Sequence, residues 1–314
     1  QRYRLQPSRL RKRTAAPASP DALSFELSYR PPYDWSALAA FLGTRAVEGV
    51  ESAGAQGYRR TVRIAYGGRE HRGWIEIAPA PKKAALRVAV SVSLARALPP
   101  LLARVKALTD LACSPSEIAQ ALGALAKSRP GLRVPGAFDG FELAVRAVLG
   151  QQITVAAART LAGRFAAAFG EPLDTPFAGL TALFPSAQRI ADLPYGRIAA
   201  LGVPAARART LVALSRAVAG SALELTPNAD VDATLAKLRA LPGVGEWTAQ
   251  YIAMRALAWP DAFPHTDYGV MKAMKLTDPR RVLAAAQAWR PWRAYAVMHL
   301  WQSLAQEGKK GGSK

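Results

Sequence analysis

A short glycine-containing turn stands before the helix that carries the most chemical information. The segment Val231 to Lys275 predicts a helix, a tight turn at 241–245 (Leu-Pro-Gly-Val-Gly), a second helix, a loop and the start of a third helix. Gly243 and Gly245 would let the backbone turn sharply and leave bare N–H groups at the start of the second helix, where the helix dipole favours an anion. Such a site would hold a DNA phosphate without reading bases. An ordinary helical hairpin closed by glycine explains the same pattern.

An acidic residue and two aromatic residues follow this turn. Trp247 and Tyr251 are four residues apart and therefore share one face of the predicted helix. Asp267 lies in the next loop, where a helix begins, so it is a candidate N-cap and also a candidate catalytic carboxylate. A fixed carboxylate stabilises a developing cation, and electron-rich rings suit a cationic ligand. The same aromatic side chains would also be at home in an ordinary core.

Charge and composition narrow the classes of partner. The 314 residues include 42 Lys and Arg against 22 Asp and Glu, a formal net charge of +20, which predicts an anionic partner, most simply nucleic acid. One cysteine and three histidines are too few for a zinc or iron–sulfur site, so we expect no metal, and we expect Cys113 to be a small buried side chain. No apolar run approaches the roughly 20 residues that cross a bilayer, so we expect no membrane contact.

Hydrophobic periodicity divides the chain into three parts. Residues 1–22 combine a basic tail with a Pro/Ala/Ser-rich linker. Residues 23–111 predict an antiparallel sheet with one or two helices, because apolar residues alternate with a period of two. The alternating stretches are 23–29, 62–66 and 86–94, and Gly67-Gly68 predicts a tight hairpin turn. A helix follows the N-cap candidate Asp34. Residues 112–314 change to a period of 3.6, with Pro and Gly between short helices. The predicted fold class is α+β, with the sheet followed by an all-helical helix-hairpin-helix domain.

Four stretches resemble one family of enzymes. They are RPPYDWSALAAFLGTRAVEGVE at 30–51, RPGLRVPGAFDGFELAVRAVLGQQITVA at 129–156, LPGVGEWTAQY at 241–251 and WRPWRAYAVMHLW at 289–301. Each resembles a stretch of the helix-hairpin-helix DNA glycosylases and, within them, of the AlkA-type 3-methyladenine DNA glycosylases II, and the resemblance covers nearly the whole chain from about Leu27. The first residues, YRLQPSRLRK, are similar to the closing helix of AraC-type regulatory domains, which would make them a fusion remnant, or else they are a plain basic tail.

The resemblance implies a reaction. In this family an alkylated base such as 3-methyladenine or 7-methylguanine is flipped out of duplex DNA, and its N-glycosidic bond is hydrolysed. The cationic base leaves readily, so the enzyme must stabilise the sugar cation instead, and the matching carboxylate is Asp267. Bifunctional members carry a lysine that forms a Schiff base at the position of Trp247. The resemblance therefore implies a monofunctional hydrolase of base excision repair.

The resemblance also implies further site residues. Trp301, which would lie against the base, Phe41 and Tyr268 would join Trp247 and Tyr251 around the cleft. DNA contacts would come from Gly243, Gly245, Thr248, Gln151 and Gln152. In this family a side chain called the wedge fills the gap that the flipped base leaves. Gln152 stands at the position of the wedge, where a bacterial member of the family has an apolar residue. The glutamine would fill the stack, hydrogen-bond the orphaned base, or simply begin a helix. His265 is expected to be a surface residue.

Two other functions stay open. The chain could be a catalytically silent, damage-sensing DNA-binding regulator, which Asp267 argues against, or a bifunctional glycosylase/lyase for oxidised purines, which Trp247 argues against. The expected partner is double-stranded DNA containing alkylated bases, bound by a monomer in a bacterial cytoplasm at the nucleoid. No cofactor is expected, and whether the hairpin carbonyls hold a monovalent cation is open.

Overall fold

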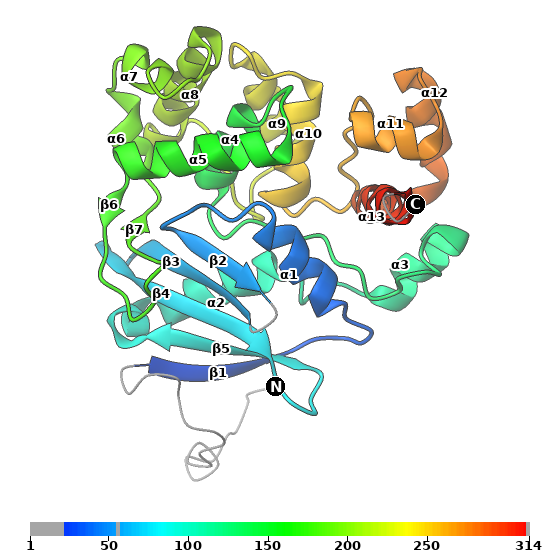
Figure 1. Cartoon of the computed structure of the whole chain (residues 1–314), viewed down its shortest axis with the longest axis horizontal. Coiled ribbons are helices and arrows are strands. Elements are labelled where there is room, and N and C mark those ends of the chain that lie inside the picture. The colour runs from blue at the N-terminus through cyan, green and yellow to red at the C-terminus, as the bar shows by residue number, and fades with distance from the viewer. Residues whose placement is uncertain (1–21, 55–56, 312–314) are drawn as a thin grey trace.

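The computed structural model describes residues 22–54 and 57–311, which form a sheet and a set of helices packed against it (Figure 1). The predictions for the basic tail of residues 1–21, including its AraC-like segment, lie outside the described residues. The sheet, blue to cyan in Figure 1, lies below the helices that follow it from α4 onward. This arrangement confirms the predicted α+β fold class.

Five antiparallel strands form the sheet in the order β1-β5-β4-β3-β2. They are β1 (Ala22–Ser28), β2 (Glu51–Gly54), β3 (Gly57–Tyr66), β4 (Arg69–Pro79) and β5 (Ala85–Ser91). Exposure largely alternates from residue to residue along β1, as expected for a strand with one covered face. Gly67 and Gly68 have φ angles of 60° and 71°, which only glycine adopts freely, and they make the predicted tight turn between β3 and β4.

The last strand is shorter than its sequence pattern predicted. The alternation continues to Leu94, but β5 ends at Ser91 and residues 92–97 form a 3-10 helix, η2 (Val92–Ala97). The Ser91 hydroxyl accepts a hydrogen bond from the Trp74 N–H at 3.1 Å, so a side chain takes a donor that would otherwise continue the ladder. Leu94 is fully buried from the new helix, whereas Val92 is 51% exposed.

Two helices accompany the sheet. The first, α1 (Trp35–Gly43), begins at the predicted N-cap, where the Asp34 carboxylate accepts from the Ala37 N–H at 2.9 Å. It buries Leu38 and Phe41 in the common core. The second, α2 (Leu98–Leu108), follows η2 directly and buries Leu101. The sheet and α1 together therefore supply one wall against which the later helices pack.

The second part of the chain is helical apart from one short ribbon. Its helices are α3 (Pro115–Leu122), α4 (Gly140–Leu149), α5 (Val155–Phe169), α6 (Ala187–Ala191), α7 (Tyr195–Ala199), α8 (Ala205–Ala219), α9 (Val231–Ala240), α10 (Glu246–Arg255), α11 (Tyr268–Met274), α12 (Pro279–Ala285) and α13 (Arg293–Gly311), with 3-10 turns η3 (Gly123–Leu125) and η4 (Ala286–Trp289). The ribbon joins β6 (Glu171–Pro172) to β7 (Ala182–Leu183). Within the described ranges, each helix is too short or too polar to cross a bilayer.

Buried ion pairs hold the sheet and the helices in one orientation. Arg60 of β3 donates to Glu142 of α4 at 2.6 Å, and Arg146 of α4 donates to Glu51 of β2 at 2.6 Å. Glu51, Arg60 and Glu142 are each at most 5% exposed. Removing one partner of a buried pair typically costs about 3 to 5 kcal/mol, because the other charge is left uncompensated. These contacts fix α4 against β2 and β3.

Candidate active site

The hairpin between α9 and α10 forms as predicted, but its two glycines do different things. Gly243 has a φ of 82°, and a Cβ at this position would overlap the side chain of Thr210. The Thr210 hydroxyl donates to the carbonyl of Pro242 at 2.7 Å, which fixes the turn. Gly245 has an ordinary φ of −89°, and a Cβ there would meet nothing within 4 Å. The expectation that both glycines shape the turn is corrected, because only Gly243 is required for its conformation.

The amino end of α10 opens into a cavity, which we call the catalytic cavity. Gly245 is the N-cap of α10 and offers no side chain to its free N–H groups, so these remain available to a ligand. The cavity has a volume of about 1030 Å³. Residues of four segments line it: Gly150 to Thr154; Pro204, Ala206, Arg207 and Thr210; the hairpin and α10 residues Gly243, Gly245, Trp247 and Thr248; and Thr266, Asp267 and Tyr268.

The carboxylate of Asp267 is held by three N–H donors from three helices. Its Oδ1 accepts from the Val270 N–H and from the Trp301 indole, each at 2.9 Å, and its Oδ2 accepts from the Trp247 indole at 2.8 Å. Asp267 is therefore the N-cap of α11 and at the same time the meeting point of α10, α11 and α13. A carboxylate has about four acceptor positions, so one on Oδ2 remains for a ligand. Gly269 makes room for this contact, because a Cβ there would lie 3.1 Å from both Asp267 and Trp301.

Four of the predicted aromatic residues form one cluster. Trp247 and Tyr251 are stacked with ring centroids 5.3 Å apart and planes at 8°. Tyr251 and Trp301 lie 6.4 Å apart, and Trp301 and Phe41 also lie 6.4 Å apart with planes at 17°. The structure thus brings together residues of α1, α10 and α13, as the resemblance implied. Trp247 lines the catalytic cavity, whereas Tyr251, Trp301 and Phe41 are not among its lining residues, and Phe41 is only 8% exposed.

The fifth predicted aromatic residue lies elsewhere. Tyr268 lines the catalytic cavity beside Asp267, but its side chain is 78% exposed, and it makes no ring contact with an aromatic side chain of the described residues. It is the first residue of α11 and directly follows the N-cap Asp267. The expectation that Tyr268 joins the aromatic cleft is corrected: it lies at the rim of the cavity.

Three polar residues predicted to contact DNA, Gln151, Gln152 and Thr248, line the same cavity. The Gln151 amide donates to the carbonyl of Gly243 and to the hydroxyl of Thr248, both at 2.9 Å. Thr248 is only 2% exposed. The side chains of Gln151 and Thr248 therefore bind the 150–154 loop to the hairpin, and a DNA contact at these positions would have to use their backbone groups. Gln152 is exposed and has a φ of 57°, and the next residue, Ile153, is 36% exposed. The loop therefore projects Gln152 and Ile153 outward together.

Two arginines next to the aromatic cluster, Arg45 and Arg255, were not predicted from the sequence. The guanidinium carbon of Arg45 lies 3.8 Å from the centre of the Phe41 ring, and that of Arg255 lies 4.9 Å from the same centre. Arg255 also donates to the Tyr251 hydroxyl at 2.8 Å. A signal for Arg255 was present, because it follows Tyr251 by four residues on α10. Arg45 likewise follows Phe41 by four residues, although it lies in the turn after α1.

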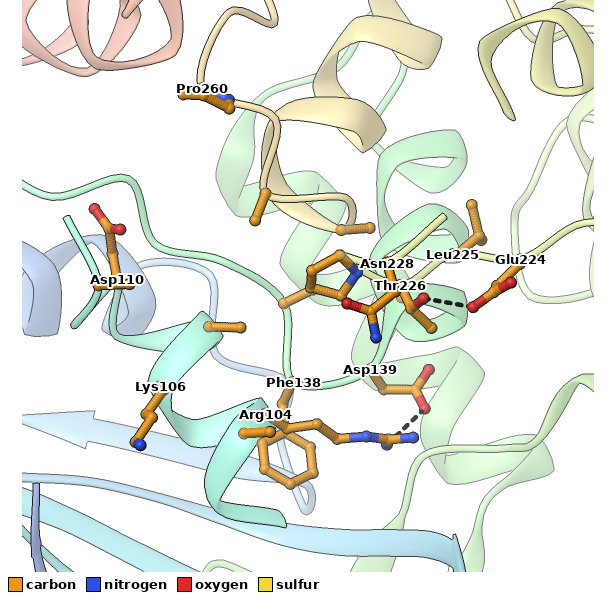
Figure 2. Close-up of a pocket in the computed structure, with 18 of the residues that line it drawn as sticks. Arg104, Lys106, Asp110, Phe138, Asp139, Glu224, Leu225, Thr226, Asn228 and Pro260 are labelled. Carbon is orange, nitrogen blue, oxygen red and sulfur yellow. Dashed lines mark hydrogen bonds and ion pairs between the residues drawn. The ribbon is translucent and has the colours of Figure 1, made fainter. Parts of the chain in front are cut away.

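A second and larger cavity, about 1200 Å³, lies beside α2 (Figure 2). Its charged side chains do not converge on one point. Arg104 faces Asp139 at 3.6 Å, while Lys106 and Asp110 lie apart from this pair (Figure 2). Asp110 accepts from the Val134 N–H at 3.2 Å and from the Tyr295 hydroxyl at 3.1 Å, and burial raises the pKa of this carboxyl to about 7. We call this the second cavity.

Cys113 is buried, as predicted, at 6% exposure. Burial raises the pKa of its thiol to about 12, so it remains protonated at neutral pH. In the part of the chain that the structure describes, His, Cys, Asp and Glu side chains form no group of three or more that could hold a metal ion.

The sequence and the fold are both similar to those of known proteins. Residues 24–139 match the family model of the AlkA N-terminal domain, and residues 145–284 match that of the HhH-GPD superfamily base excision DNA repair proteins. DNA-3-methyladenine glycosylase 2 of Escherichia coli is 37% identical over 277 residues, covering 88% of this chain and 96% of that protein.

Two further proteins extend this comparison. A probable bifunctional transcriptional activator/DNA repair enzyme AlkA of Mycobacterium tuberculosis is 40% identical over 313 residues, covering 95% of this chain and 61% of that protein. The solved structure of a 3-methyladenine DNA glycosylase from Archaeoglobus fulgidus has a TM-score of 0.74 at 18% identity and covers 88% of this chain and 97% of that one. At this identity the third likeness shows a shared fold.

Proposed function

The chain belongs to the HhH-GPD superfamily of base excision DNA repair proteins, and we propose on this premise that it is a monofunctional DNA glycosylase that flips alkylated bases out of duplex DNA and hydrolyses their N-glycosidic bonds. The observation that carries the proposal is the Asp267 carboxylate, which is fixed by three N–H donors next to the open amino end of α10. The free N–H groups at the amino end of α10, which we call the phosphate seat, are thus next to a carboxylate that can stabilise positive charge.

Asp267 acts on the sugar. As the bond to the base breaks, positive charge develops on the deoxyribose, and a carboxylate that is already oriented stabilises it without reorganising. The free acceptor position on Oδ2 can also take a proton from the attacking water. Trp247 and Trp301 keep the carboxylate in place and offer their ring faces to the base. Alkylated bases such as 3-methyladenine and 7-methylguanine, which are cationic in DNA, suit such rings.

A glycosylase/lyase reaction is not supported by this site. It requires an amine that forms a Schiff base with the sugar. Trp247 occupies the position expected for that amine, and lysine is absent from the described residues that line the catalytic cavity. A silent regulator is also disfavoured, because it would gain nothing from a carboxylate oriented by three donors. The product is therefore an abasic site with the strand intact.

The DNA partner is supported by charge and by the hairpin. The net charge of +20 favours a polyanion, and the N–H groups at the amino end of α10 suit a backbone phosphate. The exposed Gln152 and Ile153 are placed to enter the gap that the flipped base leaves. We propose a monomer acting on double-stranded DNA at the nucleoid of a bacterial cytoplasm.

A monovalent cation at the hairpin stays a prediction. Several carbonyls of the turn already accept hydrogen bonds from the protein: Leu241 from the Val244 N–H, Pro242 from Thr210 and Gly243 from Gln151. A cation would therefore have to share these carbonyls or use their neighbours. Because a carbonyl has two lone pairs, sharing is chemically allowed. No step of the reaction above depends on such an ion.

The test is release of free base from methylated duplex DNA. The wild-type protein should release 3-methyladenine and leave abasic sites without strand cleavage. Asp267→Asn should lower the single-turnover rate by about 1,000-fold while duplex affinity stays within about threefold, because it removes charge from the reaction but not from the phosphate seat. The matched control is Asp278→Asn, since Asp278 is the N-cap of α12 and lies outside the cavity lining. Equal turnover by wild type and Asp267→Asn would refute the assignment.

A further inference from the structure

The 150–154 loop is fixed at both ends and exposed between them. It begins at Gly150, the C-cap of α4, and ends at Thr154, the N-cap of α5. Gln152 and Ile153, which we call the loop tip, are exposed and line the catalytic cavity. The tip makes no side-chain hydrogen bond to the described part of the chain, so another residue must set its direction.

Gln151, directly before the tip, joins this loop to the hairpin. Its amide nitrogen donates to the carbonyl of Gly243 and to the hydroxyl of Thr248, both at 2.9 Å, which uses both N–H groups of the amide. Gly243 precedes the N-cap Gly245 and Thr248 lies in the first turn of α10, so the two bonds reach both sides of the phosphate seat. Among the described residues, no other side chain of the loop is hydrogen-bonded to the hairpin.

The hairpin end of this contact is rigid. Thr248 is only 2% exposed, and the carbonyl of Gly243 belongs to a turn that the Thr210 hydroxyl fixes by donating to Pro242 at 2.7 Å. An amide that binds two fixed acceptors is itself held in one position. The hairpin therefore sets the place of Gln151 and, with it, the start of the loop tip.

The loop tip has a backbone conformation that needs such support. Gln152 has a φ of 57°, in the left-handed region that residues with a side chain rarely adopt. Glutamine lacks the short polar side chain that helps asparagine in this region. A residue in such a conformation persists when its surroundings hold it there. The two hydrogen bonds of the neighbouring Gln151 supply this support; without them the tip can return to an ordinary φ and turn its side chains elsewhere.

We propose that Gln151 is a positioning residue that couples the phosphate seat to the loop tip, so that DNA bound at the hairpin meets a tip already directed into the gap that the flipped base leaves. The inference rests on the function proposed above and deepens it, because it assigns Gln151 to the flipping step and not to a contact with DNA. Preorganisation lowers the cost of ordering the loop upon binding. Loss of the Gln151 amide should weaken entry of the tip into DNA but not attachment of DNA at the seat.

Binding to DNA that already lacks a base tests this coupling without catalysis. The probe is a duplex with one tetrahydrofuran abasic-site analogue, compared with the same duplex intact, and the measured quantity is the ratio of the two dissociation constants. Gln151→Met keeps the length of the side chain and removes both donors. It should lower the preference for the abasic duplex about tenfold, the scale of one or two net hydrogen bonds, and change the affinity for the intact duplex less than about twofold.

Matched variants separate positioning from general destabilisation. Gln287→Met is the control, because Gln287 also donates to a carbonyl, that of Leu283 at 3.0 Å, but lies outside the cavity lining. It should leave the preference unchanged. Gln151→Glu keeps the shape of the side chain but turns an acceptor toward the carbonyl of Gly243, so it should lose at least as much preference as Gln151→Met.

The other end of the contact gives an independent measurement. Thr248→Val keeps the shape of the side chain and removes the acceptor of one of the two bonds, so it should lower the preference about threefold. Combined with Gln151→Met it should cause no further loss, because the shared bond is already gone. Thr248→Ser keeps the hydroxyl and should preserve the preference. Additive losses in the double variant would overturn the coupling.

The outcomes separate the two proposals. An unchanged preference in Gln151→Met, or an equal loss of affinity for both duplexes, would overturn the coupling, and so would a wild-type protein that binds both duplexes equally. None of these results would affect the proposed function, which release of 3-methyladenine tests separately. A wild-type protein that releases no base, while Gln151→Met still loses the preference, would overturn the proposed hydrolase and support the coupling.

Discussion

The catalytic cavity and the second cavity have similar volumes, about 1030 and 1200 Å³, yet their charged groups are arranged in opposite ways. In the catalytic cavity, donors from three helices converge on Asp267 beside an uncapped helix end. In the second cavity, Arg104 faces its own counter-ion Asp139, and Asp110 binds the protein itself (Figure 2). The difference teaches that volume alone does not mark the site that we propose as catalytic. Convergence of fixed groups on one carboxylate does.

Among the variants that test this contrast, the double variant of the two indoles should have the largest effect. The double variant Trp247→Phe/Trp301→Phe removes two N–H donors to Asp267 and keeps aromatic rings in place. Because the carboxylate would then be held by the Val270 N–H alone, the single-turnover rate of base release should fall about 100-fold. Trp292→Phe, in the lining of the second cavity, is the control and should change the rate less than about twofold. A comparable loss of rate in Trp292→Phe would mean that the two cavities do not differ in their importance for base release.

Smaller effects are expected for the two glycines of the hairpin, one of which matters for stability and the other for DNA binding. Gly243→Ala should lower the free energy of unfolding by about 2 kcal/mol, because its positive φ and the Thr210 side chain both resist a Cβ. Gly245→Ala should change stability by less than about 0.5 kcal/mol, since its Cβ enters open space. The same Cβ would stand where a phosphate must approach, so Gly245→Ala should weaken duplex binding. Urea denaturation and binding titrations measure the two effects; unaltered duplex affinity in Gly245→Ala would argue against the phosphate seat.

The smallest effect is a pH dependence that belongs to the second cavity. Burial raises the pKa of Asp110 to about 7, above its value in the unfolded chain. The folded state therefore holds a proton that the unfolded state has lost, so the free energy of unfolding falls as the pH rises from about 4 to about 7 and stays lower above that.

Asp110→Asn removes this titration and suits the positive φ of 52° at this position. The variant should be more stable than wild type by about 1 kcal/mol at pH 8 and show no such gain near pH 4. Urea denaturation at the two pH values measures the difference, and base release should be unaffected. A loss of activity as large as that of Asp267→Asn would mean that the second cavity takes part in the reaction.

Much of the fold could be read from short-range patterns. The alternation of apolar residues predicted the sheet, and Asp34 and the Gly67-Gly68 pair marked a helix start and a turn where the structure has them. Prediction stopped short where a side chain intervened: the pattern at Leu94 continues that of β5, but Ser91 takes a ladder donor and the strand ends. The ribbon of β6 and β7 is only two residues per strand, too short for any period to appear.

Within the site, the sequence by itself determined what depends on neighbours along the chain. The hairpin turn, the shared face of Trp247 and Tyr251 and the capping position of Asp267 each follow from contacts within about one helical turn. Tertiary structure alone decided that Trp301, 34 positions away, reaches Asp267, that Tyr268 lies at the rim, and that Arg255 approaches the Phe41 ring. The reason is physical: capping and periodicity act locally, whereas the meeting of Phe41, Tyr251 and Trp301 depends on how α1, α10 and α13 pack.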